Sequence, residues 1–446
     1  MSSVAGEQLL EFLADGRVAG LDVALRLEAC LEAWDSVGGG TGRTGLVAAS
    51  DPALFLAAFA AGWARGGRLV LANPGWGAQE WEEAARRLKP DLVFGAVPDV
   101  AWGGQADPAP RGSGPTVAVP TGGSGGRVRF AVHDATTLGA ATAGFQAAFG
   151  GGPLVCVSGL PLFHVSGLMP FLRAAASGGR LVWHAAGGER PVAGPGEASV
   201  ISLVPTQLAR LLREPESVEA LKCFSAVLVG GGPLPGALRR ESRDRGLPLT
   251  PSYGMTETAA AVRMVRPEAF LDGDDSSGRD LPHARVTADP SGRIHVESES
   301  LFRGYLGDDT PPSAPWPTGD LGFLDSRGGL VVTGRIRELI NSGGEKIDPG
   351  EVEAALVATG IAREARVLPR SDPEWGEVAV AVLVPGEAGH SDETRKARLR
   401  TCLAAHKAPR DWIAVDELPR TPQGKIDTAT LRRMVRAAKE TGRGDG

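Results

Sequence analysis

Two patterns of apolar and polar residues alternate along the first two thirds of the chain. Short apolar runs, each of the length of a buried strand, are followed by longer stretches with helical spacing. The paired segments are residues 45–50 with 51–64, 68–72 with 78–88, 153–157 with the run after Phe163, and 226–230 with 234–243. This alternation predicts an α/β fold in which helices cover layered, largely parallel sheets.

The pattern changes from residue 282 onward. Two segments, 283–298 and 322–335, each place a glycine-containing turn between alternating apolar and polar positions. Such segments are typical of β-hairpins. We therefore expect a β-rich subdomain at the end of a large N-terminal domain that spans residues 1–335.

A compact pattern of its own follows Arg335. The expected elements are a helix from 348, strands over 364–385, a helix over 392–405 and a terminal helix over 428–438. In the first helix Asp348 is placed to cap, Pro349 fits the first helical position and Glu351 completes a capping box. These elements predict a small α+β domain over residues 336–446.

Bulk composition narrows the classes of function. The 446 residues are too many for one ordinary hydrophobic core. The net charge is −6 and the basic residues are spread through the chain, so no basic cluster indicates a surface that binds nucleic acid. The apolar run at 53–64 is shorter than the ~18 residues of a membrane span. The N-terminus carries Glu7 and Glu11 in place of a basic signal-peptide start, so we expect a cytoplasmic protein. The cysteines lie far apart, without metal-ligand spacing.

The stretch PTGGSGGRVRF, residues 120–130, is too rich in glycine to bury apolar surface. Glycine lets backbone N–H groups approach a ligand closely, and an anion is the natural candidate. The stretch is not a Walker loop, because no lysine followed by a hydroxyl residue is present. Thr121 and Ser124 remain as hydroxyl donors for phosphate oxygens, although a purely structural turn is an alternative at this point.

A second stretch, SYGMTETAA at residues 252–260, gathers three kinds of chemistry. Tyr253 offers an aromatic face, Thr256 a hydroxyl for phosphate, and Glu257 a carboxylate suited to Mg²⁺. A polar loop before an alanine-rich segment explains any one of these residues, but explains all three poorly.

Six stretches together resemble the ordered motifs of the adenylate-forming family, which includes acyl-CoA synthetases and carrier-protein adenylation domains. They are PTGGSGGRVRF, GGGPLP, SYGMTETAA, TGDLGFL, GRIRELINSGGEKIDPGEVE and PRTPQGKID, and they extend from about residue 116 to the C-terminus. The resemblance implies that a small-molecule carboxylic acid reacts with ATP to give an acyl-adenylate, and that a thiol then displaces AMP. It implies ATP, Mg²⁺ and coenzyme A as cofactors.

The resemblance also implies a role for each matching residue. The phosphates would be held by Thr121, Gly122, Gly123, Ser124, Gly125 and Arg129. The nucleoside would meet Gly231, Gly232 and Pro233 beside the adenine, Tyr253 stacked on the base, and Asp320 and Arg335 at the ribose. Thr256 would bind the α-phosphate, Glu257 would hold Mg²⁺, and Lys425 would reach the reacting carboxylate from the small domain.

In this family the small domain rotates about a hinge next to the GR pair. Ser342, Gly343 and Gly344 would then face the site and leave a slot for pantetheine. Three positions depart from the family pattern: Arg129 replaces the usual lysine, Val128 a common proline, and Arg337 the usual hinge residue. Arginine keeps the charge but changes its geometry.

Local stretches around FHVSGLM and SLVPTQLARLL look most like the o-succinylbenzoate–CoA ligases of menaquinone and phylloquinone biosynthesis. The free aromatic carboxylate of such a substrate needs polar company. The candidates are His164, Ser166, Thr206, Gln207 and Arg263. The alternatives are another acyl- or aryl-CoA ligase, a carrier-protein adenylation enzyme, or a nucleotide-binding protein without turnover.

Overall fold

The computed structural model divides into two compact units by its internal contacts. One unit comprises Met1–Val286, Val296–Trp316 and Asp325–Leu330, and the other Thr287–His295, Pro317–Leu324 and Val331–Gly446. The structure describes residues 5–39, 42–103, 114–122, 128–184, 198–308, 311–336, 340–342, 345–372, 375–386, 391–400, 403, 407–421 and 426–441. The predicted boundary at 335/336 stays a prediction.

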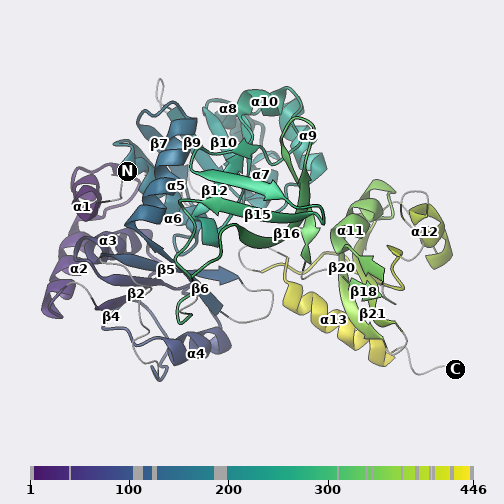
Figure 1. Ribbon diagram of the computed structural model, residues 1–446, viewed down its shortest axis with the longest axis horizontal. Helices are drawn as coiled ribbons and strands as arrows, with labels where there is room; N and C mark the ends of the chain where they lie inside the picture. The colour runs from purple at the N-terminus through teal and green to yellow at the C-terminus, as the bar shows by residue number, and fades with distance from the viewer. Residues whose placement is uncertain are drawn as a thin grey trace. The chain divides into compact units, whose positions relative to one another are not determined.

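The larger of two sheets in the first unit has eight strands, some of which are labelled in Figure 1. In spatial order they are β1 (Val18–Ala19), β8 (Arg180–Trp183), β7 (Leu154–Ser158), β9 (Ala198–Leu203), β10 (Ala226–Val229), β11 (Leu249–Met255), β12 (Ala260–Met264) and β13 (Arg279–Asp280). Pairing is parallel from β1 to β11 and antiparallel beyond. The predicted parallel α/β arrangement is confirmed here.

The second sheet of this unit has five strands. Their order is β4 (Leu92–Gly95), β2 (Thr44–Ala48), β3 (Arg68–Leu71), β5 (Thr116–Gly122) and β6 (Val128–Asp134). The first four run parallel, and β6 returns antiparallel to β5. The β5–β6 pair therefore forms the edge at which the glycine-rich stretch begins and ends.

Helices cover both sheets, as expected for this class of fold. They are α1 (Gly6–Ala14), α2 (Ala24–Ser36), α3 (Pro52–Ala64), α4 (Ala78–Arg87), α5 (Ala135–Ala148), α6 (Val165–Ala176), α7 (Pro205–Leu211), α8 (Pro215–Lys222), α9 (Gly236–Asp244) and α10 (Pro267–Leu271). Helix α3 packs on α1, α2 and strands β2 to β4, and its residues from Phe55 to Trp63 are buried throughout. The apolar run at 53–64 is thus a core helix.

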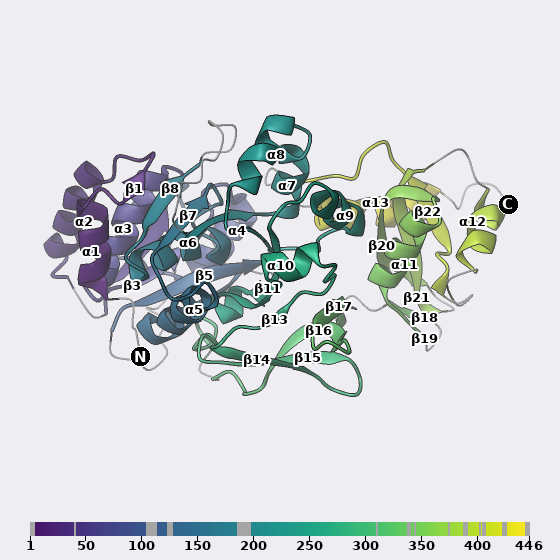
Figure 2. The ribbon, with the colours of Figure 1, turned by 90° about the horizontal axis from the view of Figure 1, so that it is seen from above.

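The two predicted hairpins form a four-stranded sheet, part of which is seen in Figure 2. Its order is β14 (Ala284–Ala288), β15 (Arg293–Ser298), β16 (Trp316–Leu324) and β17 (Leu330–Arg335). Strands of this sheet are shared between the two compact units.

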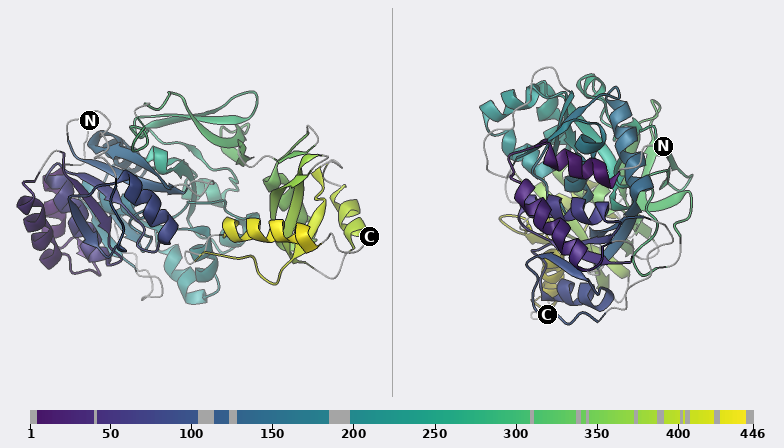
Figure 3. Two further views of the ribbon diagram at one scale, coloured as in Figure 1. Left: turned by 90° about the horizontal axis from the view of Figure 1, so that it is seen from below. Right: turned by 90° about the vertical axis from the view of Figure 1, so that its left-hand side faces the viewer.

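The second unit contains the predicted α+β pattern. Its sheet runs β19 (Glu345–Ile347), β18 (Ile340–Ser342), β21 (Gly376–Pro385) and β20 (Ala362–Asp372), with β22 (Asp411–Ala414) also on β21. The helices are α11 (Pro349–Ala358), α12 (Asp392–Leu399) and α13 (Thr428–Thr441). Leu431 and Val435 bury one face of α13 against β20 and β21. Figure 3 shows α13, in yellow, alongside this sheet.

The start of α11 differs from the expected capping box in one residue. The Asp348 carboxylate accepts from the backbone N–H of Gly350 at 2.8 Å, as a capping residue should. The Glu351 carboxylate instead binds the Lys407 ammonium group at 2.6 Å. A lysine distant in sequence therefore outcompetes the local bond that the capping pattern predicts.

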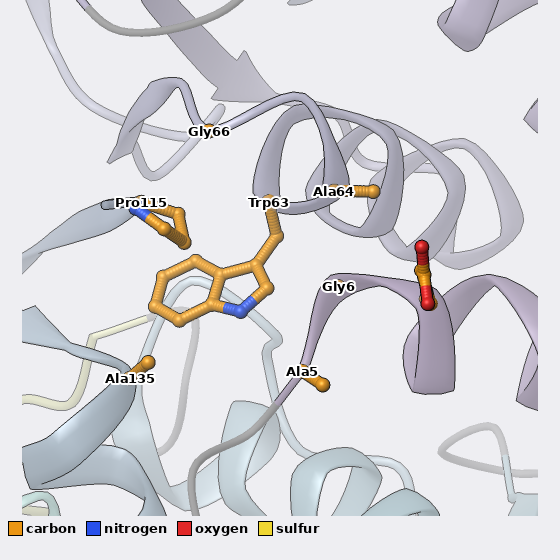
Figure 4. A pocket seen from close by; sticks show the side chains of 8 residues that line it. Ala5, Gly6, Trp63, Ala64, Gly66, Pro115 and Ala135 are labelled. Carbon is orange, nitrogen blue, oxygen red and sulfur yellow. The ribbon is translucent and has the colours of Figure 1, made fainter. Parts of the chain in front are cut away.

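None of the described helices is both long and apolar enough to cross a membrane. A small pocket in the first unit has the indole ring of Trp63 on one side and Pro115 and Ala135 on another (Figure 4). None of the residues that line this pocket belongs to the predicted site.

Candidate active site

Four adjacent strands of the large sheet lead at their carboxyl ends to ten of the predicted site residues. The chain leaves β7 toward His164, β9 toward Thr206 and Gln207, and β10 toward Gly231. Tyr253 lies near the end of β11, and Thr256 and Glu257 follow that strand directly. In parallel sheets these ends meet at one edge, where ligands bind. The fold therefore brings together stretches that lie far apart in the sequence.

The glycines after β10 have a backbone conformation that suits a flat ligand. Gly231 has a φ of 78°, in the left-handed region that side chains disfavour. A side chain at Gly232 would meet no neighbouring atom within 4 Å, and both Gly232 and Pro233 are exposed. This open backbone can lie against the adenine base, which is the role predicted for residues 231–233.

Strand β11 ends in a short 3₁₀ helix, η1 (Thr256–Thr258), and we call these three residues the η1 turn. The Thr256 carbonyl lies 2.8 Å from Nε2 of His133, a fully buried residue of β6. A carbonyl can only accept, so Nε2 carries the hydrogen. Burial lowers the pKa of His133 to about 4, which keeps the ring neutral at pH 7.

Glu257 is held on both its backbone and its side chain. Its carbonyl accepts from the backbone N–H of Phe302 at 2.8 Å. The Tyr305 hydroxyl donates to Oε1 of its carboxylate at 2.6 Å. Among the described residues no three histidine, cysteine or acidic side chains gather as metal ligands. A single oriented carboxylate nevertheless fits Mg²⁺, which is usually held by one or two carboxylates together with substrate phosphates.

Strands β5 and β6 place two predicted phosphate ligands opposite each other. Thr121 pairs in register with Arg129, and Gly122 pairs with Val128. The Thr121 hydroxyl is buried without a hydrogen-bond partner in the described structure. A buried unsatisfied hydroxyl costs free energy, and a phosphate oxygen would satisfy it. Gly123, Ser124 and Gly125 lie outside the described residues.

The predicted ribose ligands form a pair in the second unit. Arg335 Nε lies 2.7 Å from Oδ1 of Asp320, whose side chain is 6% exposed while that of Arg335 is 55% exposed. The two residues come from neighbouring strands β16 and β17. Lys425, Gly344 and Arg337 lie outside the described residues, so their predicted roles stay predictions.

The five candidates for the acyl pocket fall into two groups. His164 and Ser166 lie at the start of α6, and Thr206 lies at the start of α7; all three are partly exposed. Gln207 and Arg263 have structural partners. The Gln207 carboxamide oxygen accepts from the backbone N–H of Val204 at 3.2 Å. Arg263 donates to the Gly328 carbonyl at 2.7 Å and lies 3.1 Å from Asp280.

Sequence comparison agrees with this geometry. Residues 95–306 match the AMP-binding enzyme family, and residues 351–425 match the AMP-binding enzyme C-terminal domain. The chain belongs to the AMP-binding enzyme family. The resemblance inferred from the six motifs is thereby confirmed.

Similar members of the AMP-binding enzyme family include three CoA ligases. The chain is 36% identical over 285 residues to 2-succinylbenzoate–CoA ligase from Bacillus velezensis, covering 60% of this chain and 58% of that enzyme. The Bacillus subtilis enzyme of the same name is 34% identical over 302 residues, covering 63% and 60%. Indoleacetate–CoA ligase from Aromatoleum aromaticum is 34% identical over 301 residues, covering 62% and 58%. The match thus covers less than two thirds of each relative.

Solved structures show the same fold at lower identity. The Bacillus subtilis o-succinylbenzoate CoA synthetase in complex with its acyl-adenylate intermediate superimposes with a TM-score of 0.74 at 24% identity, covering 92% of each chain. A Mycobacterium tuberculosis fatty acyl CoA synthetase gives a TM-score of 0.67 at 21% identity, covering 93% of this chain and 92% of that one. The predicted large and small domains are those of this fold.

Three side chains that the motifs of the AMP-binding enzyme family did not reveal stand out in the structure. His133 and Tyr305 hold the η1 turn, as described above. Arg173 of α6 is 4% exposed, its guanidinium carbon lies 3.7 Å from the centroid of the Phe145 ring, and its Nε has no hydrogen-bond partner in the described structure. The position of Arg173 nine residues after His164 on one apolar helix is the only sequence signal for it.

Proposed function

We propose that this protein activates o-succinylbenzoate with ATP and transfers the acyl group to coenzyme A. In the first step a carboxylate oxygen of the acid attacks the α-phosphorus of ATP, and pyrophosphate leaves. In the second step the thiol of coenzyme A loses its proton and attacks the acyl carbon, and AMP leaves. The product is a thioester, and the acid gains its reactivity from the phosphate leaving group.

Support for the nucleotide half comes from the residues at the strand ends. Open backbone at Gly231, the buried free hydroxyl of Thr121 and the oriented carboxylate of Glu257 match the needs of a base, a phosphate and a cation in turn. Mg²⁺, when bound, would neutralise charge on the phosphates. Thr256 would donate to the α-phosphate, and Lys425 would approach the reacting carboxylate.

The observation that carries the choice of acid is the buried cation Arg173. Burial lowers the pKa of Arg173 only to about 10, so the guanidinium stays charged at pH 7. No carboxylate of the described residues pairs with it. An uncompensated buried charge is costly, and an anionic group of a ligand would offset that cost. The only carboxylate of a monocarboxylic acid is consumed in the reaction, whereas o-succinylbenzoate has a second carboxylate that stays charged.

The surroundings of Arg173 strengthen this interpretation. Both ring nitrogens of His283 are buried without a hydrogen-bond partner in the described structure, and burial together with the nearby Arg173 charge lowers the pKa of His283 to about 4. A neutral imidazole can donate one further hydrogen bond to a carboxylate. Arg173 lies roughly 13 Å along the helix from His164, at 1.5 Å rise per residue. This depth suits the end of an acid that is remote from the reacting carboxyl.

A panel of acids tests the proposal. Purified protein with ATP, Mg²⁺ and coenzyme A is offered o-succinylbenzoate, indoleacetate, benzoate and a fatty acid, and pyrophosphate release and thioester mass are measured. We expect o-succinylbenzoate to react at least about 100-fold more efficiently, because one matched ion pair at a buried site is worth ~3 kcal/mol. Faster turnover of indoleacetate would support the runner-up, which the similarity to the Aromatoleum aromaticum enzyme favours.

Substitution of Arg173 tests whether this residue recognises the acid. Arg173→Met should raise the KM for o-succinylbenzoate about 100-fold while the KM for ATP stays within about twofold. Its stability should be retained, because replacing a buried charge by an apolar side chain is often neutral. An unchanged KM for the acid would exclude Arg173 from its recognition. Absence of acid-dependent pyrophosphate release in the unaltered protein would favour a nucleotide-binding protein without turnover.

A further inference from the structure

Tyr305 lies between two residues of opposite charge that the proposed function assigns to ATP and its metal. The hydroxyl of Tyr305 donates to Oε1 of Glu257 at 2.6 Å. The guanidinium carbon of Arg129 lies 4.3 Å from the centroid of the Tyr305 ring. One side chain thus contacts the carboxylate through its polar tip and the cation through its aromatic face.

The backbone around Tyr305 is fixed to the strand that bears Arg129. Tyr305 forms an antiparallel bridge with Ala131, and the Leu306 N–H donates to the Phe130 carbonyl at 2.9 Å. Rings of Phe302 and Trp316 pack beside the Tyr305 ring, with centroids 4.9 and 6.4 Å away. Because both the backbone and the ring are held, the hydroxyl has a defined position.

We propose that Tyr305 is a positioning residue that orients Glu257 toward the metal and keeps Arg129 from neutralising it. This inference rests on the proposed function, since it takes Glu257 as the Mg²⁺ ligand. With Oε1 engaged by the hydroxyl, Oε2 presents its lone pairs to a cation. The structure records no ion pair between Arg129 and Glu257, and the Tyr305 side chain is in contact with both.

The same contact explains why an arginine suits position 129. A planar guanidinium stacks on an aromatic face better than the compact ammonium group of lysine does. The stack keeps the Arg129 charge beside β5, opposite Thr121, where phosphate oxygens are expected. The departure from the family lysine and the placement of Tyr305 therefore belong to one arrangement.

The experiment measures binding of Mn²⁺, in place of Mg²⁺, to the protein with ATP and no carboxylic acid, so that no turnover occurs. Electron paramagnetic resonance counts free Mn²⁺ during the titration. Tyr305→Phe, which removes only the hydroxyl, should weaken Mn²⁺ binding about tenfold, as loss of a hydrogen bond to a metal ligand commonly does. Affinity for ATP in the presence of a chelator should stay within about twofold.

Two further variants separate the ring from the hydroxyl. Tyr305→Leu also removes the aromatic face, and should weaken ATP binding several-fold even with the chelator present, because Arg129 loses its stack. Ser36→Ala removes a hydroxyl at the exposed end of α2, away from every residue assigned to ATP or the metal, and should leave Mn²⁺ affinity unchanged. Thermal unfolding of each variant without ligand identifies any general loss of structure.

The outcomes distinguish the two proposals. If Glu257→Gln abolishes Mn²⁺ binding while Tyr305→Phe leaves it within twofold of the unaltered protein, the positioning role is wrong and the proposed function stands. If Tyr305→Phe weakens ATP binding equally with and without the metal, its role is structural and the inference is also overturned. If the unaltered protein binds no Mn²⁺ with ATP, both proposals fail.

Discussion

The η1 turn and the Asp320–Arg335 pair are both predicted to bind ATP or its metal, yet they are built in opposite ways. Separate segments of chain fix the carbonyls of the turn: His133 donates to Thr256, Phe302 to Glu257 and Ser300 to Thr258, the last at 2.9 Å. The Asp320–Arg335 pair comes from one hairpin, and its arginine is more than half exposed.

This difference separates two kinds of candidate ligand. Buried hydrogen bonds from remote segments stabilise the fold as well as the ligand geometry, because each leaves an unsatisfied group when its partner is removed. In the Asp320–Arg335 pair only the carboxylate is buried, and water screens the more than half-exposed arginine, so the pair contributes little to stability. Substitutions near the turn should therefore reduce stability and binding together, whereas substitutions of Arg335 should reduce binding alone.

The largest effect is expected from pH at His133. Burial lowers its pKa from 6.5 to about 4 in the folded protein; the hydrogen bond to the Thr256 carbonyl and the Asp134 charge raise the pKa, and the Arg303 charge lowers it. Below pH 6.5 His133 binds a proton in the unfolded chain, whereas in the folded protein it stays neutral down to about pH 4. The contribution of His133 to the free energy of unfolding is therefore complete above pH 6.5, and it falls by about 3 kcal/mol toward pH 4.

Urea unfolding between pH 4 and 7 measures this loss. His283, whose pKa is also about 4, adds a second loss of stability at low pH. His133→Gln retains an N–H donor but does not titrate, so its stability should depend less steeply on pH than that of the unaltered protein. Equal slopes for the two proteins would contradict the buried, neutral histidine.

A smaller effect is expected from Ser300, which is fully buried. Ser300→Ala removes the donor to the Thr258 carbonyl and should lower the free energy of unfolding by about 1–2 kcal/mol. Nucleotide affinity should fall with it, because the turn that carries Glu257 loses an anchor. Calorimetry with and without AMP checks both; a change in stability without any change in affinity would separate the turn from the binding site.

The smallest effect on stability is expected at Arg335. Arg335→Met should weaken AMP binding about tenfold, yet change the free energy of unfolding by less than about 0.5 kcal/mol. Arg335→Lys keeps the charge but loses the planar donor geometry, so its affinity for AMP should lie between those of the unaltered protein and Arg335→Met. A large loss of stability in either variant would show that the Asp320–Arg335 pair stabilises the fold as the η1 turn does, and would contradict the difference between them.

The fold was predictable to the extent that local patterns decide it. Four strand–helix pairs were correctly placed, namely β2 with α3, β3 with α4, β7 with α6 and β10 with α9, because periodicity and capping act over a few residues. Helices α1 and α2 were not predicted, although Leu27, Cys30 and Trp34 of α2 have the spacing of one buried face. Glu351 shows the limit of the capping rule, since its partner Lys407 is 56 residues away.

The motifs name candidate ligands, but they do not reveal the residues that hold those candidates in place. Thr256 and Glu257 lie in a recognisable stretch, but the contact from His133 spans 123 residues and that from Tyr305 spans 48. Arg173 lies in an apolar helix whose pattern indicates core packing. Only the assembled structure shows that its Nε is buried and unpaired.

The scarcity of tyrosine has a practical consequence. The chain contains two, Tyr253 in β11 and Tyr305 beside Glu257, and both are at the candidate site. Protein grown with fluorotyrosine would give a ¹⁹F spectrum of two resonances, with no background from the rest of the molecule. Occupancy by nucleotide and by metal would then be read separately and without a chemical tag.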